Sequence, residues 1–381
     1  MKFSVNSAKL LKHLSSISGV IATNPIVPIL ENFLFVLKDG KLTVTASDLQ
    51  TVMVLELEVE STDNGNIAIP ARLLLDTLRG LPDQSIAFTV DHATYGIQIN
   101  TNNGLYKLSG ENPTDFPKVP AVSNSTSVDF PSDILLRAIT NTIFATSTDE
   151  LRPAMTGVFL HLTPASPAGG DGGSTFVATD GHRLIRYRRS DVVSGLDASL
   201  IIPRKALNLL KTSLPSEAVT VKTEFNQANA FFSFSNIRMI CRLIDERFPD
   251  YENAIPVNND NILTIDRMEL LNSLKRISIY SNRTTHQIRL KINGNDLQIS
   301  AEDLDYSNEA NERLTCEYHG EDLEIGFNAR FIVEMLSNMT SKSITLELSA
   351  PNRAGLILPK EVEDHEEILM LVMPVMLNNY A

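Results

Sequence analysis

The stretch that decides the fold is Phe176-Val177-Ala178-Thr179-Asp180-Gly181, an apolar run that ends at an acidic turn. Related runs occupy residues 43–49, where the aspartate is Asp48, and residues 298–304, where it is Asp303. Runs of β-branched and small residues that stop at an aspartate are typical of a strand followed by a turn. The chain therefore contains one strand-and-turn pattern three times.

A second tract, in which a strand leads into a helix through proline or asparagine, recurs at residues 67–74, 200–207 and 324–331. A third tract closes the first two copies at Phe116-Pro117 and Phe248-Pro249. The first two copies are offset by 132 or 133 residues, and the last two by 123 to 125. Tracts that keep both their order and their spacing indicate an internal repeat.

Three repeats suit the length, because 381 residues exceed what one hydrophobic core usually supports. Segments rich in Pro, Ser and Asn follow the first and second copies, as is typical of linkers. We therefore predict three domains at residues 1–122, 123–257 and 258–381.

Apolar residues at helical spacing predict two helices in each repeat, over residues 7–19, 70–80, 131–147, 203–213, 266–281 and 328–340. Alternating runs with turn residues between them predict antiparallel hairpins, for example around Lys38-Asp39-Gly40. The predicted fold class is α+β, with three repeated domains that each place two helices against antiparallel sheet.

The composition, 43% hydrophobic and 21% charged, is that of an ordinary globular protein without an apolar run long enough to cross a bilayer. Polar Ser7, Lys9 and Lys12 interrupt the apolar stretch that a signal peptide needs. We expect a cytoplasmic protein with no membrane partner. Cys241 and Cys316 form no CxxC pair, which favours buried reduced thiols over disulfides or zinc ligands.

The net charge of −13 is unusual for a protein that grips nucleic acid through phosphates. The six predicted helices nevertheless carry twelve basic and only five acidic side chains, so the acidic excess lies in strands and loops. This segregation fits a body that repels DNA except along a helical surface. Helix faces rich in lysine and arginine are also common on ordinary solvent-exposed surfaces.

Signatures of nucleotide hydrolysis and of common hydrolases, such as GxxxxGK[ST], HExxH and GxSxG, are absent. Asp180, His182 and Arg183 together could form an acid–base site. The other two copies keep the aspartate and lack the histidine and arginine, so we interpret Asp180 as a turn residue. His182 and Arg183 suit binding better than catalysis, and we predict no catalytic residue, metal or cofactor. A three-domain enzyme and a repeat-built scaffold or adhesion protein are the alternatives.

Several motifs resemble the bacterial beta sliding clamps, the DNA polymerase III beta subunit family. They lie at residues 178–184, 202–205, 247–251, 1–3, 28–30 and 372–374. The resemblance covers essentially the whole chain. It implies a non-catalytic processivity factor, a head-to-tail homodimer whose six domains form a ring with helices lining the hole. Such a ring encloses double-stranded DNA without reading its sequence and tethers the replicative polymerase, the clamp loader and repair proteins through short linear motifs.

The resemblance also implies roles for single residues. The DNA-facing residues would be Arg72, Arg79, Arg137, Arg204, Lys205 and Lys211. The pocket for partner peptides would comprise Arg152, Met155, Thr179, Gly181, His182, Arg183, Leu184, Pro249, Ala254, Leu371, Val372, Met373, Pro374 and Val375. The dimer interface would involve Leu105, Tyr106, Lys107, Leu108, Ile279, Tyr280, Glu302 and Asp303, with Asp305, Glu309 and Glu312 nearby.

The chain departs from the family pattern at a few of these places. Asn24 stands where an arginine facing DNA is expected, and Asn253 and Met376 stand where basic residues are expected. Pro153 and Ala154 replace expected aromatic residues. Residues 164–174, with a Gly-Gly-Asp-Gly-Gly core, are expected to form a flexible loop between two strands.

Overall fold

The structure is a computed structural model that describes residues 1–123, 125–165 and 172–377. Most of the predicted glycine-rich loop lies outside the described residues, although strands do flank it as expected. No helix in the described part of the chain is both long and apolar enough to cross a membrane.

The described residues contain six α-helices, which confirms the prediction from periodicity. They are α1 (Ser7–Ser18), α2 (Ala71–Gly80), α3 (Ser132–Thr142), α4 (Arg204–Ser213), α5 (Arg267–Ile277) and α6 (Ala329–Ser337). Side chains of Asn6, Asp266 and Asn328 cap three of them by accepting bonds from backbone N–H groups of the first turn. Helices α3 and α5 end earlier than predicted, because 3-10 turns at η3 (Ile143–Ala145) and η6 (Ser278–Tyr280) tighten their ends.

The chain divides into two compact units, Met1–Leu136 with Lys205–Leu243 and Arg137–Arg204 with Ile244–Ala381. In the first unit, an eight-stranded sheet has the order β5-β2-β3-β4-β16-β15-β14-β9. Its strands are β2 (Asn32–Lys38), β3 (Lys41–Ser47), β4 (Thr51–Glu58), β5 (Gly65–Pro70), β9 (Thr126–Pro131), β14 (Thr220–Phe225), β15 (Asn229–Phe234) and β16 (Ile237–Arg242).

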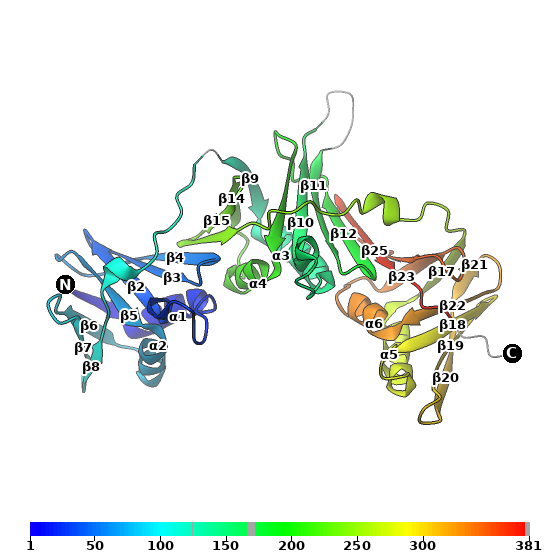
Figure 1. The fold of residues 1–381 in the computed structure, drawn as a ribbon, viewed down its shortest axis with the longest axis horizontal. Coiled ribbons are helices and arrows are strands. Elements are labelled where there is room, and N and C mark those ends of the chain that lie inside the picture. Colours follow the sequence, from blue (N-terminus) through cyan, green and yellow to red (C-terminus); the bar gives the residue numbers. More distant parts are fainter. Residues whose placement is uncertain (124, 166–171, 378–381) are drawn as a thin grey trace. The chain divides into compact units, whose positions relative to one another are not determined.

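A second sheet of the first unit has the order β1-β6-β7-β8. Its strands are β1 (Lys2–Asn6), β6 (Ser85–Val90), β7 (Gly96–Asn100) and β8 (Leu105–Ser109). Helices α1 and α2 lie side by side on the sheets (Figure 1). Leu10, Leu14 and Leu74 are fully buried there, so the apolar stripes that predicted these helices also form the core.

The second unit holds a nine-stranded sheet of order β13-β10-β11-β12-β25-β24-β23-β17-β21. Its strands are β10 (Gly157–Thr163), β11 (Gly173–Thr179), β12 (Arg183–Arg189), β13 (Ala198–Pro203), β17 (Asn261–Asp266), β21 (Glu317–His319), β23 (Ser343–Leu348), β24 (Gly355–Pro359) and β25 (Glu366–Val372). A four-stranded sheet, β20-β19-β18-β22, completes the unit with β18 (Gln287–Asn293), β19 (Asp296–Asp303), β20 (Asn308–Thr315) and β22 (Leu323–Asn328).

The two large sheets each join strands of neighbouring repeats. Strand β4 of the first repeat pairs with β16 of the second, and β12 of the second pairs with β25 of the third, both antiparallel. Each pairing provides hydrogen-bond partners for the backbone N–H and C=O groups of a strand that would otherwise lie at a sheet edge. The compact units consequently do not follow the repeats, and the domain boundaries placed from the sequence stay predictions.

Candidate functional site

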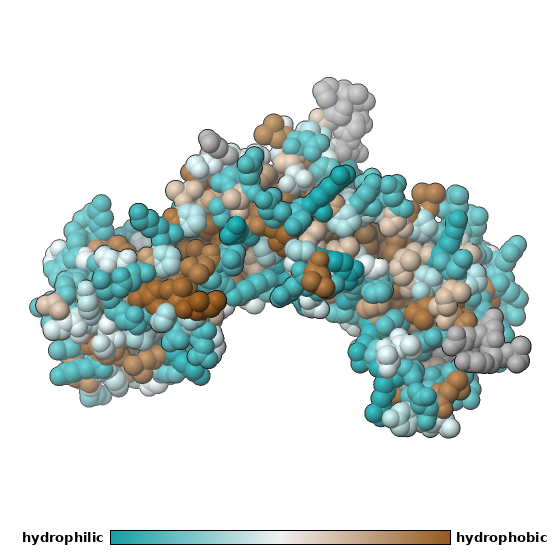
Figure 2. Space-filling model, in the orientation of Figure 1, coloured by the Kyte–Doolittle hydropathy of each residue, from teal (hydrophilic) through white to brown (hydrophobic). Residues whose placement is uncertain are grey.

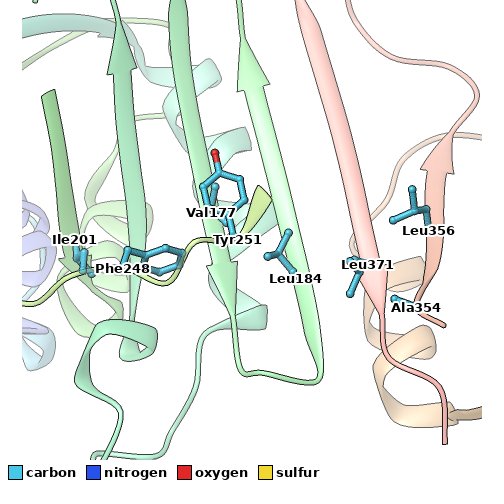
Figure 3. Packing of buried hydrophobic residues seen from close by; sticks show 8 residues of the cluster. All are labelled: Val177, Leu184, Ile201, Phe248, Tyr251, Ala354, Leu356 and Leu371. Atoms are coloured by element: carbon cyan, nitrogen blue, oxygen red, sulfur yellow. The ribbon is translucent and has the colours of Figure 1, made fainter. Parts of the chain in front are cut away.

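An apolar cluster lies on one face of the nine-stranded sheet. Figure 3 shows its eight side chains in a row across the strands: Val177, Leu184, Ile201, Phe248, Tyr251, Ala354, Leu356 and Leu371. Leu184 on β12 stands directly opposite Leu371 on β25, so the row is continuous across the joint between the second and third repeats.

Aromatic rings fix the chain segment that crosses this face. Phe248 stacks on Phe159 of β10 with ring centroids 4.7 Å apart, and Tyr251 meets both rings edge-on. Burial raises the pKa of the Tyr251 phenol, so the ring stays neutral. The segment that carries Pro249 and Ala254, two residues predicted for the peptide pocket, is thus attached to the sheet.

The turn at residues 179–183 connects β11 and β12, the strands that carry Val177 and Leu184 of the row (Figure 3). The Asp180 carboxylate accepts bonds from the backbone N–H groups of His182 (2.9 Å) and Arg183 (3.0 Å). Gly181 has φ +90°, and a Cβ there would lie 2.9 Å from Nη1 of Arg152. The positive φ favours glycine at this position, whereas the exposed Arg152 side chain could move to make room for a Cβ.

The same aspartate chemistry holds the equivalent turns of the other repeats. Asp48 accepts bonds from the N–H groups of Gln50 and Thr51, and Asp303 accepts one from Asp305. The interpretation of these aspartates as turn residues is confirmed. Asp303 is only 3% exposed, so its carboxylate supports the turn instead of presenting charge at the surface predicted for the dimer interface.

Arg183 does not lie on the same face as Leu184, because successive residues of a strand point to opposite sides of the sheet. Its side chain is 7% exposed. The guanidinium donates to Asp180 (3.0 Å), to Glu334 of α6 (2.7 Å) and to the carbonyl of Phe144 (2.8 Å). Val372 stands opposite Arg183 in the register and is also buried. Neither residue belongs to the apolar row, and their part in a peptide pocket stays a prediction.

Other predicted pocket residues remain accessible beside the row. His182 is exposed and its ring stacks on Phe331 at 5.9 Å, while Met373 is 43% exposed. Arg152 is exposed and pairs with Asp149 at 2.9 Å. Met155, Pro249, Pro374 and Val375 are partly exposed, Thr179 is buried, and Ala254 is exposed. The structure thus brings most of the predicted set to one region of the second unit.

Sequence reasoning missed several members of the row. Phe248 and Tyr251 stood inside a recognised motif and could have been chosen as aromatic anchors, whereas Ala354 and Leu356 had no local signal. Glu334 was missed because nothing in the sequence links it to Arg183, 151 residues away.

The basic residues predicted to face DNA differ in their partners. Arg79 pairs with Asp76 at 2.7 Å, and Lys205 pairs with Asp48. Arg137 binds Glu366 and Glu363 and is only 25% exposed. The remaining three, Arg72, Arg204 and Lys211, take part in no ion pair among the described residues. Arg137 therefore has less free charge than Arg72, Arg204 and Lys211, and the DNA-facing set stays a prediction.

The residues predicted for the dimer interface differ in exposure. Strand β8 pairs only with β7, and its Leu105 and Tyr106 are 52% and 40% exposed. Leu108 is buried beneath its own sheet. Ile279 and Tyr280 of η6 are 77% and 44% exposed. Figure 2 shows that the surface on the viewed side is mainly hydrophilic, with separate hydrophobic patches.

The possible metal ligands and the two cysteines are predicted from the sequence to have no role in binding a metal. No group of three or more His, Cys, Asp or Glu side chains among the described residues is arranged to hold a metal ion. Both cysteines are buried and unpaired, and burial raises the pKa of the Cys241 thiol to about 12. The expected burial of the two thiols is confirmed.

Comparisons with known proteins agree along the whole chain. Family models for the DNA polymerase III beta subunit match in three parts: the N-terminal domain at residues 1–120, the central domain at 129–250 and the C-terminal domain at 252–375. The beta sliding clamp of Pseudomonas putida is 29% identical over 97% of this chain and 99% of its own length. That of Vibrio cholerae is 27% identical over 99% and 100%.

A crystal structure of the sliding clamp of Pseudomonas aeruginosa bound to griselimycin matches with a TM-score of 0.92 and 28% identity, covering 99% of this chain and 100% of that one. The three clamp domains, the antiparallel sheets and the six helices of the predicted fold are confirmed by this match. The chain belongs to the DNA polymerase III beta subunit family, the sliding clamps that serve as processivity factors in DNA replication.

Proposed function

We propose that two copies of this chain close head to tail into a ring of six domains that encircles double-stranded DNA. Because the contact joins two different surfaces of the protomer, it gives a ring if the rotation closes and an open filament if it does not, and we propose that it closes after two copies. The ring then stays on DNA by topology and needs no tight phosphate contacts. A protein with net charge −13 can work in this way.

The observation that carries the ring is that the first repeat and the third repeat each contain an edge strand, β8 and β20 respectively, next to exposed apolar side chains. Strand β8 is an edge strand with exposed apolar side chains, and β20 is an edge of the four-stranded sheet. Inside the chain, β4–β16 and β12–β25 already join neighbouring repeats edge to edge. Pairing of β8 with the β20 end of a second copy would repeat this arrangement.

Charge complements the apolar centre of the proposed contact. Lys107 is exposed on β8, and Glu302, Asp305 and Glu309 are exposed around β19 and β20. Opposite charges around an apolar patch favour one register of association and speed encounter.

The substitution Lys107→Glu should therefore weaken dimerisation roughly tenfold, because it places like charges across the contact. Sedimentation velocity over a protein dilution series measures the effect. The matched control is Lys38→Glu, which reverses an exposed lysine at the end of β2. Equal dimer dissociation constants for the two variants would place the contact elsewhere.

The apolar row and the exposed residues beside it form the proposed docking site for short apolar motifs of partner proteins. Leu184 and Leu371 supply the floor, and Met373 and His182 supply accessible edges. Methionine adapts to differently shaped ligands, which suits a site that receives several partners. We assign the replicative polymerase, the clamp loader and repair proteins to this one site.

We further propose that the chain acts without catalysis, as an accessory subunit. Asp180 and Arg183, the charged members of the possible acid–base cluster, bond to each other and to the surrounding structure. Tethering raises the local concentration of the polymerase at the primer end, an effect of linkage that requires no reactive group.

A further inference from the structure

We infer that Arg183 is a positioning residue of the peptide site, which acts by fastening the 179–183 turn to helix α6 through Glu334 and makes no contact with the partner. This inference rests on the proposed docking site. It assigns Glu334, on a helix outside the apolar row, a part in partner binding.

The first support is the location of Arg183 on the hidden side of the sheet. Its neighbour Leu184 belongs to the apolar row, whereas the guanidinium lies between the rings of Phe144 and Phe331, 5.4 Å and 5.0 Å from their centroids. With its side chain 7% exposed, it has no free surface for a peptide. Its donors are distributed over three different elements.

Those three elements are the turn itself, η3 and α6. Nε holds Asp180, Nη2 holds the carbonyl of Phe144 in η3, and Nη1 holds Glu334 in α6. A planar guanidinium can bridge three acceptors with fixed angles, which a lysine ammonium on a flexible stem cannot reproduce. Arg183 thus determines where the turn stands relative to α6.

The 179–183 turn also positions His182 and Met373, which form the accessible edge of the docking site. The carbonyl of His182 accepts a bond from the N–H of Met373 at 2.8 Å, so the start of the exposed 373–377 segment follows the turn. The His182 ring also stacks on Phe331, a residue of α6. Loosening the Glu334 contact should therefore let His182 and Met373 move together, leaving the floor residues in place.

Substitution Glu334→Gln tests this link with little risk to folding, because the Glu334 side chain is 47% exposed. Surface plasmon resonance measures binding of the clamp variants to the immobilised, purified catalytic subunit of the polymerase from the same organism. We expect affinity to fall about threefold to tenfold, since a charge-assisted bond to the positioning arginine is lost. Arg183→Lys should lose at least as much.

The matched control is Glu324→Gln, which removes the carboxylate paired with Arg289 in the same unit. Hydrogen exchange at the amides of His182 and Met373 is the second readout, and it should quicken in Glu334→Gln and stay unchanged in Glu324→Gln. Equal polymerase affinity for wild type and Glu334→Gln would overturn the inference and leave the docking site intact. Absence of polymerase binding by the wild type would overturn the docking site itself.

Discussion

Replacing Glu366 by glutamine should destabilise the second unit by about 3 kcal/mol, the lower end of the range for breaking a buried ion pair. The Glu366 side chain is fully buried and accepts two bonds from Arg137 and one from the backbone N–H of Glu363. The loss stays at the lower end because Arg137 is 25% exposed and retains Glu363. Urea unfolding followed by circular dichroism measures the change.

The matched control is Glu363→Gln, which removes the other carboxylate that Arg137 contacts, at 2.9 Å. Because Glu363 is 54% exposed, its pair should contribute under about 1 kcal/mol. Similar losses for the two variants would contradict the role given to the buried pair at the start of β25.

The stabilisation by the Arg137–Glu366 ion pair should also depend on pH. Burial opposes ionisation of Glu366, yet the bonds from Arg137 and the Glu363 N–H outweigh it and lower the pKa of this carboxyl. A depressed pKa in the folded state stabilises above the unfolded pKa and is lost as pH falls through the folded value. The advantage of the wild type over Glu366→Gln should therefore be constant near neutrality and shrink in acid.

Deleting residues 373–381 should weaken polymerase binding about a hundredfold while the second unit still folds, because the cut removes the accessible apolar contacts of the docking site, Met373 among them. Cutting after Val372 keeps β25 whole, whereas a deletion from Leu371 would remove two buried residues of that strand. The cut breaks the backbone bonds from Met373 to His182 and from Val375 to Gly326, worth roughly 2 kcal/mol together.

Surface plasmon resonance against the polymerase catalytic subunit measures the loss, and urea unfolding verifies the fold. Ile26→Ala serves as the control, because it removes a 98% exposed apolar side chain from the first unit. Undiminished binding by the truncated chain would remove Met373–Val375 from the docking site.

Local features of this fold could be predicted from the sequence because their causes are local. The six helices follow from apolar spacing, and the turns at Asp48, Asp180 and Asp303 follow from a carboxylate that bonds backbone N–H groups two or three residues ahead. The threefold repeat added the domain count, since each tract could be compared with its copies.

Long-range pairings could not be predicted in the same way. Helical periodicity places Arg137 on a polar face, but its carboxylate partner Glu366 lies 229 residues further along the chain. Strand alternation would have separated Arg183 from Leu184, yet only the structure supplies Phe144 and Glu334 as the partners of the arginine. Arg183 and Leu184 are neighbours in the predicted pocket, yet their side chains have different surroundings: Arg183 is bonded to η3 and α6, and Leu184 belongs to the apolar row.

The most direct test of the central claim is retention of the clamp on circular and on linear DNA. The labelled protein is loaded onto a nicked circular plasmid by the clamp loader of the same organism. Gel filtration then separates the protein–DNA complexes from unbound protein. Half of the sample is then linearised with a restriction enzyme and both halves are filtered again. A ring held by topology stays on the circle and is lost from the linear DNA through its ends. Equal retention on both would contradict encirclement, because it would mean that direct contacts hold the protein on DNA.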